Sequence, residues 1–126
     1  MPDMRTFRTS IQIEHVVERG RLVAIDNVLV DTGSEYSWMP RPLLESIGIR
    51  VEGTQNFRVA DGRALQREVG FAIVRAAGAF APDFVVFAEP GDMVLLGARS
   101  LEGLNLRVDP VSKTLVDAGP VLAGAT

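Results

Sequence analysis

The sequence predicts a mainly β fold: a small closed barrel with one or two short helices. Three observations support this prediction. Short segments that alternate polar and apolar residues recur along the chain, and a period of two is typical of a half-buried strand. Clusters of glycine and proline separate these segments, as they do in barrels and sandwiches. The length of 126 residues suits one domain, so we expect a single domain over residues 1–126 with a core over about 7–116.

Two strands are expected in the first quarter of the chain. Residues 7–13 alternate apolar and polar side chains, which predicts a half-buried strand, and residues 18–20 predict a turn. Residues 22–30 are mostly apolar and rich in branched side chains, which is typical of a buried strand. Asp26 and Asn27 interrupt this apolar run and indicate a bulge or a kink.

A helix and a hairpin are expected in the middle of the chain. Proline suits the first turn of a helix and glycine suits the position after its end, so Pro42 and Gly48 frame a short helix. Asp61-Gly62 is a strong hairpin turn between two predicted strands, over residues 56–60 and 65–74. The later predicted elements are strands over 84–87 and 94–96, helical turns over 98–104, a closing hairpin from 106–108 and 114–116, and a loose tail over 117–126.

Composition excludes several classes of function. The chain has no cysteine, which excludes disulfides, thiolate metal sites and cysteine nucleophiles. His15 is the single histidine, so Ser–His and multi-histidine metal chemistry are not expected, and we expect neither a metal nor a cofactor. The net charge of −3 comes without a basic stripe, so no nucleic-acid partner is expected. No apolar run reaches the roughly 18 residues of a membrane span, and we expect a cytoplasmic protein without a membrane partner.

Asp31 is the candidate with the most specific surroundings. It directly follows a predicted buried strand, where an ionised carboxylate is costly unless nearby donors support it. Thr32 and Ser34 offer hydroxyl groups, and Gly33 leaves room for a close approach of backbone or substrate. The simplest alternative is an ordinary turn, because Asp, Thr, Gly and Ser are all common in turns.

The order and spacing of several motifs resemble the retropepsin family of aspartic proteases. These motifs are the strand before Asp31-Thr32-Gly33-Ser34, the helix that follows, the Asp61-Gly62 hairpin, and Leu95-Leu96-Gly97 before a short helix. The resemblance covers about residues 7–116 and implies a closed retropepsin-like barrel with a flap hairpin. It implies that Asp31 is catalytic, that Thr32, Gly33 and Ser34 form the active-site loop, that Asp61 and Gly62 form the flap tip, and that Leu95, Leu96 and Gly97 support the loop.

The resemblance also implies how the activity would arise. Aspartic proteolysis uses two carboxylates that share one proton, and they titrate as a pair. The chain has one Asp-Thr-Gly, so a second, identical chain must supply the other carboxylate, and a homodimer acting on a peptide or protein substrate is implied. Asp117-Ala118-Gly119 lacks the threonine and lies beyond Leu95-Leu96-Gly97, so it is interpreted as a decoy.

Some residues depart from the family pattern and leave alternatives open. Ala98 stands where retroviral proteases usually carry an arginine that ties the helix to the loop, and Arg99 follows it. The flap tip is not rich in glycine. A second hypothesis is therefore a non-proteolytic retropepsin-like module that binds peptides or dimerises. A third is an unrelated small barrel that binds a ligand, with Asp31 in a surface turn.

Four further side chains near these motifs have expected roles. Tyr36 and Trp38 are expected to pack near the loop, and the alternative is that they line a pocket. Arg63 and Arg67 are expected to be solvated charges on the flap.

Overall fold

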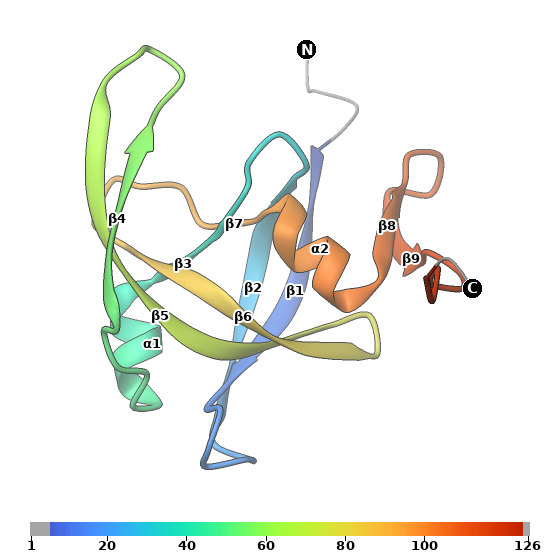
Figure 1. Cartoon of the computed structure of the whole chain (residues 1–126), viewed down its shortest axis with the longest axis horizontal. Coiled ribbons are helices and arrows are strands. Elements are labelled where there is room, and N and C mark those ends of the chain that lie inside the picture. Colours follow the sequence, from blue (N-terminus) through green and yellow to red (C-terminus); the bar gives the residue numbers. More distant parts are fainter. Residues whose placement is uncertain (1–5, 125–126) are drawn as a thin grey trace.

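The computed structural model describes residues 6–124, and its elements confirm the mainly β class with two short helices (Figure 1). The helices are α1 (Arg41–Ser46) and α2 (Ala98–Leu104). The strands are β1 (Thr6–Glu14), β2 (Leu22–Asp31), β3 (Ser37–Pro40), β4 (Gly53–Arg58), β5 (Ala64–Ala76), β6 (Ala79–Ala88), β7 (Leu95–Leu96), β8 (Leu106–Asp109) and β9 (Thr114–Asp117).

Seven of these strands form one sheet that closes on itself. The strand order is β1-β2-β7-β3-β6-β5-β4, and β1 also pairs with β5, which closes the ring and confirms the predicted barrel. In this ring β4 pairs only with β5, so the β4–β5 hairpin projects from it (Figure 1). The strands β8 and β9 pair with each other as a separate sheet, as the predicted closing hairpin requires.

The side chains inside the ring form the core. Val28, Val30, Met39, Phe87 and Leu96 are fully buried and come from four neighbouring strands, β2, β3, β6 and β7. They alternate with partly exposed residues along β2 and β3, which is the pattern of a sheet with one covered face. The main core therefore lies on one face of these strands.

The β2 bulge predicted at Asp26 and Asn27 is confirmed. The register of β1 against β2 shifts between Thr9 and Ile11, so Ser10 faces both residues. Asn27 adopts a φ of 63°, in the left-handed region that asparagine tolerates better than most residues. The Ser10 hydroxyl donates a hydrogen bond to Asp26 Oδ1 at 3.0 Å, which fixes the bulge in place.

Two strands differ from the prediction for physical reasons. The strand β3 has only four residues, too few to show a period, and it was not predicted. The strand β6 begins five residues earlier than predicted and contains Pro82, which cannot donate a ladder hydrogen bond. Proline is tolerated here because β3 pairs only with Val85–Ala88 of β6, which leaves Pro82 at an edge beside β5 alone.

The carboxylate of Glu14 joins the end of β1 to β5 and to the turn before β2. It accepts hydrogen bonds from Gly20 N at 2.6 Å and from Arg75 Nε at 2.8 Å, and it pairs with Arg19 at 3.3 Å. The backbone bond from Gly20, together with these arginines, lowers the pKa of Glu14 to about 2. These contacts between β1, β5 and the turn therefore depend on the ionised form of Glu14.

We expect acid to weaken the fold through Glu14. Its pKa is lower in the folded chain than in the unfolded chain, so the stabilisation is complete above the unfolded value of 4.5 and is lost as the pH falls toward 2. Urea unfolding at several pH values between 6 and 2.5 should show a smaller loss in Glu14→Gln than in the original chain. Glu45→Gln, at an exposed position of α1, is the control and should unfold like the original chain at pH 7. Equal pH dependence with and without Glu14 would contradict the assignment.

Within residues 6–124, neither helix has the length and apolar composition that a membrane crossing requires.

Candidate active site

Asp31 is the last residue of β2, where the strand leaves the sheet. Its backbone pairs with Thr6 of β1, and two residues earlier Leu29 pairs with Leu95 of β7. Gly33 N donates a hydrogen bond to Asp31 Oδ1 at 3.0 Å, and Ser34 Oγ donates one to Asp31 Oδ2 at 3.1 Å. Each carboxylate oxygen thus has one donor within the loop and keeps further acceptor capacity. The sequence-based expectation that donors lie close to this carboxylate agrees with these contacts.

The loop after Asp31 leaves little room for side chains near the carboxylate. A Cβ at Gly33 would lie 3.3 Å from Asp31 Oδ1, tighter than an ordinary contact. Thr32 and Gly33 are exposed at the tip of the loop, whereas Asp31 and Ser34 are half-buried. The tip of the loop is therefore exposed, and the half-buried Asp31 carboxylate accepts its hydrogen bonds from the loop itself.

Strand register places the Asp31 side chain on the face of the sheet opposite the core. Leu29 pairs with Leu95, Leu95 with Trp38, and Trp38 with Val86. Directly paired residues share a face, and residues two apart on a strand share it too. Asp31 therefore lies on the same face as these four side chains, and we call this face the open face.

Gly97 packs directly behind the Asp31 loop. A Cβ at Gly97 would lie 2.5 Å from Tyr36 O and 2.9 Å from Glu35 O, so only glycine fits without displacing the backbone. The next two residues tie α2 to the loop, because Ala98 N donates to Ser34 O at 2.7 Å and Arg99 N donates to Glu35 O at 3.0 Å. Two backbone N–H groups therefore hold the loop at the position where the family pattern has an arginine.

The side chain of Arg99 also contacts the loop. Its Nε lies 3.2 Å from Glu35 Oε2, and its guanidinium lies over the Tyr36 ring at 4.8 Å from the centroid. Both partners of the ion pair are largely exposed, so the pair contributes little to stability. The tie between α2 and the loop consists mainly of the backbone contacts.

A buried chain of hydroxyl groups lies beneath the loop. Gly97 N donates to Ser37 Oγ at 3.0 Å, the Ser37 and Ser100 hydroxyls are hydrogen-bonded, and Ser100 Oγ donates to Asp83. Burial raises the pKa of Asp83, and the hydrogen bond from Ser100 partly offsets this. The sequence analysis did not identify Ser37, Ser100 or Asp83. Ser37 and Ser100 are buried in the structure, where a hydroxyl needs a partner, but polar residues surround both in the sequence and no local signal marks them.

The β4–β5 hairpin has the geometry expected of a flap. Its tip is closed by a hydrogen bond from Gly62 N to Val59 O at 2.8 Å, with Gly62 at a φ of 90° that favours glycine. Asp61 accepts a hydrogen bond from Arg63 N at 2.9 Å and pairs with the Arg63 side chain, so the Asp61-Gly62 turn is confirmed. Figure 1 shows the hairpin tip and the loop after β2 at the same end of the molecule, opposite the β1–β2 turn.

Aromatic contacts join this hairpin to the segment after Asp31. The ring of Phe57 on β4 lies edge-on to Tyr36 at 5.7 Å and tilted against Trp38 at 4.9 Å. Tyr36 and Trp38 therefore pack as expected, and Tyr36 also lines a cavity on the open face. The hairpin thus rests on the open face close to the Asp31 loop.

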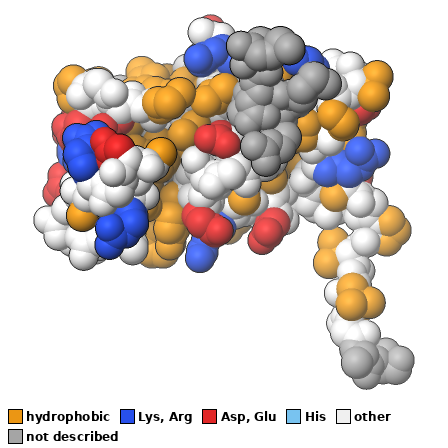
Figure 2. Space-filling view, turned by 90° about the horizontal axis from the view of Figure 1, so that it is seen from above, with side chains coloured by type: hydrophobic (Ala, Val, Ile, Leu, Met, Phe, Trp, Pro, Cys, Tyr) orange, Lys and Arg blue, Asp and Glu red, His pale blue; other side chains and the backbone are white. Residues whose placement is uncertain are grey.

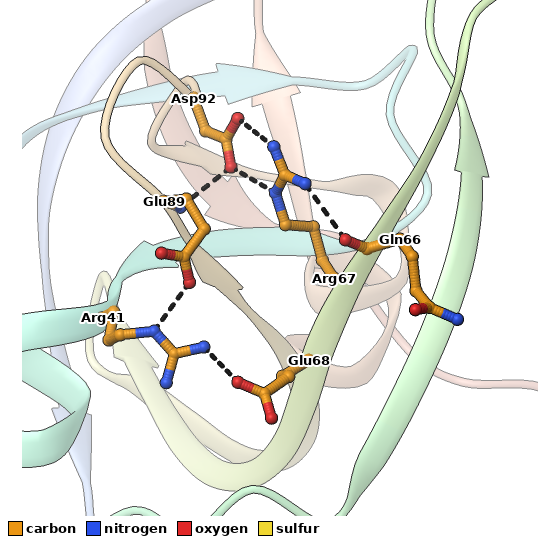
Figure 3. A network of polar contacts seen from close by, with 6 residues as sticks. All are labelled: Arg41, Gln66, Arg67, Glu68, Glu89 and Asp92. Carbon is orange, nitrogen blue, oxygen red and sulfur yellow. Dashed lines mark hydrogen bonds and ion pairs between the residues drawn. The ribbon is translucent and has the colours of Figure 1, made fainter.

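A network of ion pairs fixes the base of the hairpin to the loop before β7 (Figure 3). Arg67 donates two hydrogen bonds to Asp92, from Nε at 2.7 Å and from Nη2 at 2.9 Å. Arg41 at the start of α1 donates to Glu89 at 2.6 Å and also pairs with Glu68. Hydrogen bonds from Arg67 lower the pKa of Asp92. The expectation that Arg67 is a solvated charge is wrong, because only 20% of its side chain is exposed and its partner is 12% exposed.

His15 has a local role in the turn between β1 and β2. Its Nδ1 accepts hydrogen bonds from Val17 N at 3.1 Å and from Glu18 N at 2.9 Å. Across residues 6–124, no three His, Cys, Asp or Glu side chains gather as metal ligands would.

Comparison with known proteins agrees with this architecture. A family model described as "Aspartyl protease" matches residues 18–99, well over half of the chain, and this range contains Asp31, the β4–β5 hairpin and Gly97. No curated protein matches the chain at a significant level. The solution structure of the simian foamy virus (mac) protease is similar, with a TM-score of 0.51 and 19% identity over 76% of this chain and 92% of that chain. This likeness confirms the retropepsin-like fold, and the family match excludes an unrelated barrel. The chain belongs to the aspartyl protease family.

Proposed function

We propose that the chain is an aspartic endopeptidase that acts as a homodimer, with Asp31 of each copy forming the catalytic pair. The observation that carries this proposal is the hydrogen-bonded Asp31 carboxylate on the open face, beside the flap, in a chain with one Asp-Thr-Gly. Two carboxylates brought together across a twofold axis share one proton. One then activates a water molecule, and the other donates a proton to the oxygen of the scissile carbonyl.

The loop supplies the support that this chemistry needs. The Gly33 N–H and the Ser34 hydroxyl each donate to a different Asp31 oxygen, so the carboxylate is held at both oxygens within its own chain. The exposed Thr32 side chain is available to contact the second copy.

Exposed apolar residues at the C-terminal end also favour assembly. Residues 118–124 have no regular secondary structure, and in Figure 2 this end of the chain extends away from the body. Val121 and Leu122 are 74% and 90% exposed, although aliphatic side chains are normally covered. The tail predicted over 117–126 begins one residue later, because Asp117 belongs to β9, and its first residue is anchored by a hydrogen bond from Ala118 N to Asn105 O at 2.9 Å. A second copy would cover these side chains.

Mixing active and inactive chains tests catalysis and assembly together. We expect Asp31→Asn to inactivate every dimer that contains it, so the activity of an exchanged 1:1 mixture should be about one quarter of that of the original chain alone at the same total concentration. The assay is cleavage of a proteome-derived peptide library, measured by mass spectrometry after the chains have exchanged. Mixing with Asp117→Asn is the control and should leave the activity unchanged.

The other outcomes of this experiment contradict specific parts of the proposal. A linear fall to about one half would show that each chain acts alone. Absence of cleavage by the original chain would instead favour the alternative function, a non-proteolytic module that binds peptides or dimerises.

A further inference from the structure

A series of hydrogen bonds, which we call the hydroxyl chain, runs from the residue before α2 to the carboxylate of Asp83 on β6. Gly97 N donates to Ser37 Oγ at 3.0 Å. The hydroxyls of Ser37 and Ser100 are hydrogen-bonded, and Ser100 Oγ donates to Asp83 Oδ2. The two serines are 0% and 2% exposed, so water does not compete for these bonds. The hydroxyl chain therefore links β3, α2 and β6 inside the fold.

The chemistry of the groups sets the direction of every hydrogen in the hydroxyl chain. A backbone N–H can only donate, so Ser37 Oγ is the acceptor for Gly97. An ionised carboxylate can only accept, so the one hydroxyl hydrogen of Ser100 goes to Asp83. The hydrogen of Ser37 is then donated to Ser100 Oγ. All three hydrogens point toward Asp83, and each bond polarises and strengthens the next.

Protonation of Asp83 weakens the hydroxyl chain at its end. A neutral carboxyl group is a poorer acceptor than a carboxylate. If the carboxyl proton were donated to Ser100, the hydroxyl hydrogens would reverse, and the hydrogen of Ser37 would point at the N–H of Gly97, which is also a donor. The complete hydroxyl chain therefore needs the ionised form of Asp83.

The surroundings of Asp83 determine where it ionises. Burial raises its pKa, whereas the hydrogen bond from Ser100 and the positive charge of Arg99 on α2 act in the opposite direction. Its strand partner on β5 is Ala72, which is apolar and fully buried. Because the pKa lies above the ordinary value, Asp83 loses its charge at a higher pH than an exposed aspartate does.

The start of α2 also holds the loop that follows Asp31. Ala98 N donates to Ser34 O at 2.7 Å, and Ser34 Oγ donates to Asp31 Oδ2 at 3.1 Å. The preceding residue, Gly97, packs against the backbone of Tyr36 with no space for a Cβ. A shift of Gly97 therefore displaces the loop and the hydroxyl that orients the Asp31 carboxylate.

We propose that Asp83 is a positioning residue, which holds the Asp31 loop in place through the hydroxyl chain. Asp83 is three residues from Val86 on β6, so its side chain lies on the opposite side of the sheet from the open face and does not reach a substrate there. The inference rests on the proposed endopeptidase function and adds an ionisable group remote from the reacting atoms.

Two replacements of Asp83 separate the acceptor from its charge. Asp83→Leu removes the acceptor, and kcat should fall about tenfold or more with KM changed less than about twofold, because the loop is displaced while the substrate surface is kept. Asp83→Asn retains an oxygen that accepts from Ser100, so it should restore most of kcat at neutral pH. The acid side of the kcat profile should show two ionisations in the original chain, one of the Asp31 pair and one of Asp83, and only the first in Asp83→Asn.

The pair of Ser10 and Asp26 provides a matched control. It has the same hydroxyl-to-carboxylate hydrogen bond, at 3.0 Å, but it is exposed and lies at the β2 bulge. Asp26→Leu and Asp26→Asn should keep the kcat and the pH profile of the original chain. Equal losses of kcat in Asp26→Leu and Asp83→Leu would overturn the proposal. An Asp83→Leu effect confined to KM, or an unchanged acid side in Asp83→Asn, would overturn it too.

Nuclear magnetic resonance tests the coupling without any cleavage. In the Asp31→Asn chain, which lacks the titration of the catalytic candidate, the amide shifts of Gly97 and Ser34 should follow the ionisation of the Asp83 carboxyl carbon as the pH is lowered. Adding Asp83→Asn should abolish this component of the shifts, and adding Asp26→Asn should leave it. Amides that do not follow Asp83 would overturn the proposal even where cleavage is observed. Coupled amides in a protein whose original chain cleaves nothing would support the positioning by Asp83 and contradict the proposed function alone.

Discussion

Replacing Asp31 with asparagine should reduce peptide cleavage by at least about a thousandfold and leave the fold intact. Asparagine has nearly the same shape, and its oxygen can still accept the hydrogen bond from Gly33 N. It cannot hold the proton that two carboxylates share, so the variant lacks both the base and the acid of the reaction. Cleavage rates should be compared with circular dichroism and thermal unfolding of the same samples.

Asp117 offers a control that tests the context of the motif. Its local geometry is similar, because Gly119 N donates to Asp117 Oδ1 at 2.6 Å. However, Asp117 ends β9 in the separate two-stranded sheet and is exposed, whereas Asp31 ends a strand inside the closed ring. Asp117→Asn should therefore retain full cleavage. Cleavage that survives Asp31→Asn, or that is lost in Asp117→Asn, would remove the assignment of Asp31.

Replacing Gly97 with alanine should destabilise the chain by about 3 kcal/mol or more, near the upper end of the cost of overpacking. The added Cβ would lie 2.5 Å from Tyr36 O, 2.8 Å from Tyr36 C and 2.9 Å from Glu35 O. All three are backbone atoms of the loop that follows Asp31, so no side-chain rotation can relieve the contact. The change in unfolding free energy is measurable by urea denaturation, and residual cleavage should fall with it as the loop shifts.

Gly103 in α2, the helix that directly follows Gly97, is the matched control. A Cβ at Gly103 would meet Ala81 Cβ at 3.8 Å, which is an ordinary contact. Alanine is a better helix former than glycine, so Gly103→Ala should stabilise the chain by about 0.5–1 kcal/mol. Similar effects at the two glycines would show that space behind the loop does not limit residue choice at Gly97.

Features determined by neighbouring residues could be predicted from the sequence. The Asp31 loop, the Asp61-Gly62 turn, the helix α2 and the bulge at Asn27 each depend on a few consecutive side chains. The order of these features along the chain is visible in the sequence, and the family resemblance is what gives this order a functional meaning.

Features that depend on distant partners could not be predicted. Arg67 was expected to be solvated, but its partner Asp92 lies 25 residues further along the chain. The hydroxyl chain from Ser37 to Ser100 joins residues 63 apart, and nothing local to either serine indicates the other. The first half of β6 was missed because alanine and proline are weak strand formers, and pairing with β5 outweighs their preference.

The ion pairs at the base of the β4–β5 hairpin limit how this hairpin can move. On β5, Arg67 pairs with Asp92 and Glu68 pairs with Arg41 (Figure 3). These two residues therefore fix the hairpin to the loop before β7 and to α1. Both Arg67 and Asp92 are mostly buried, so salt screens their attraction only weakly. A rigid swing of the entire hairpin would break these pairs, whereas bending beyond Arg67 leaves them intact. Under the proposed function, the hairpin would therefore open for substrate by bending beyond Arg67, and the part that moves, from Arg67 to the turn, is only about 20 Å long.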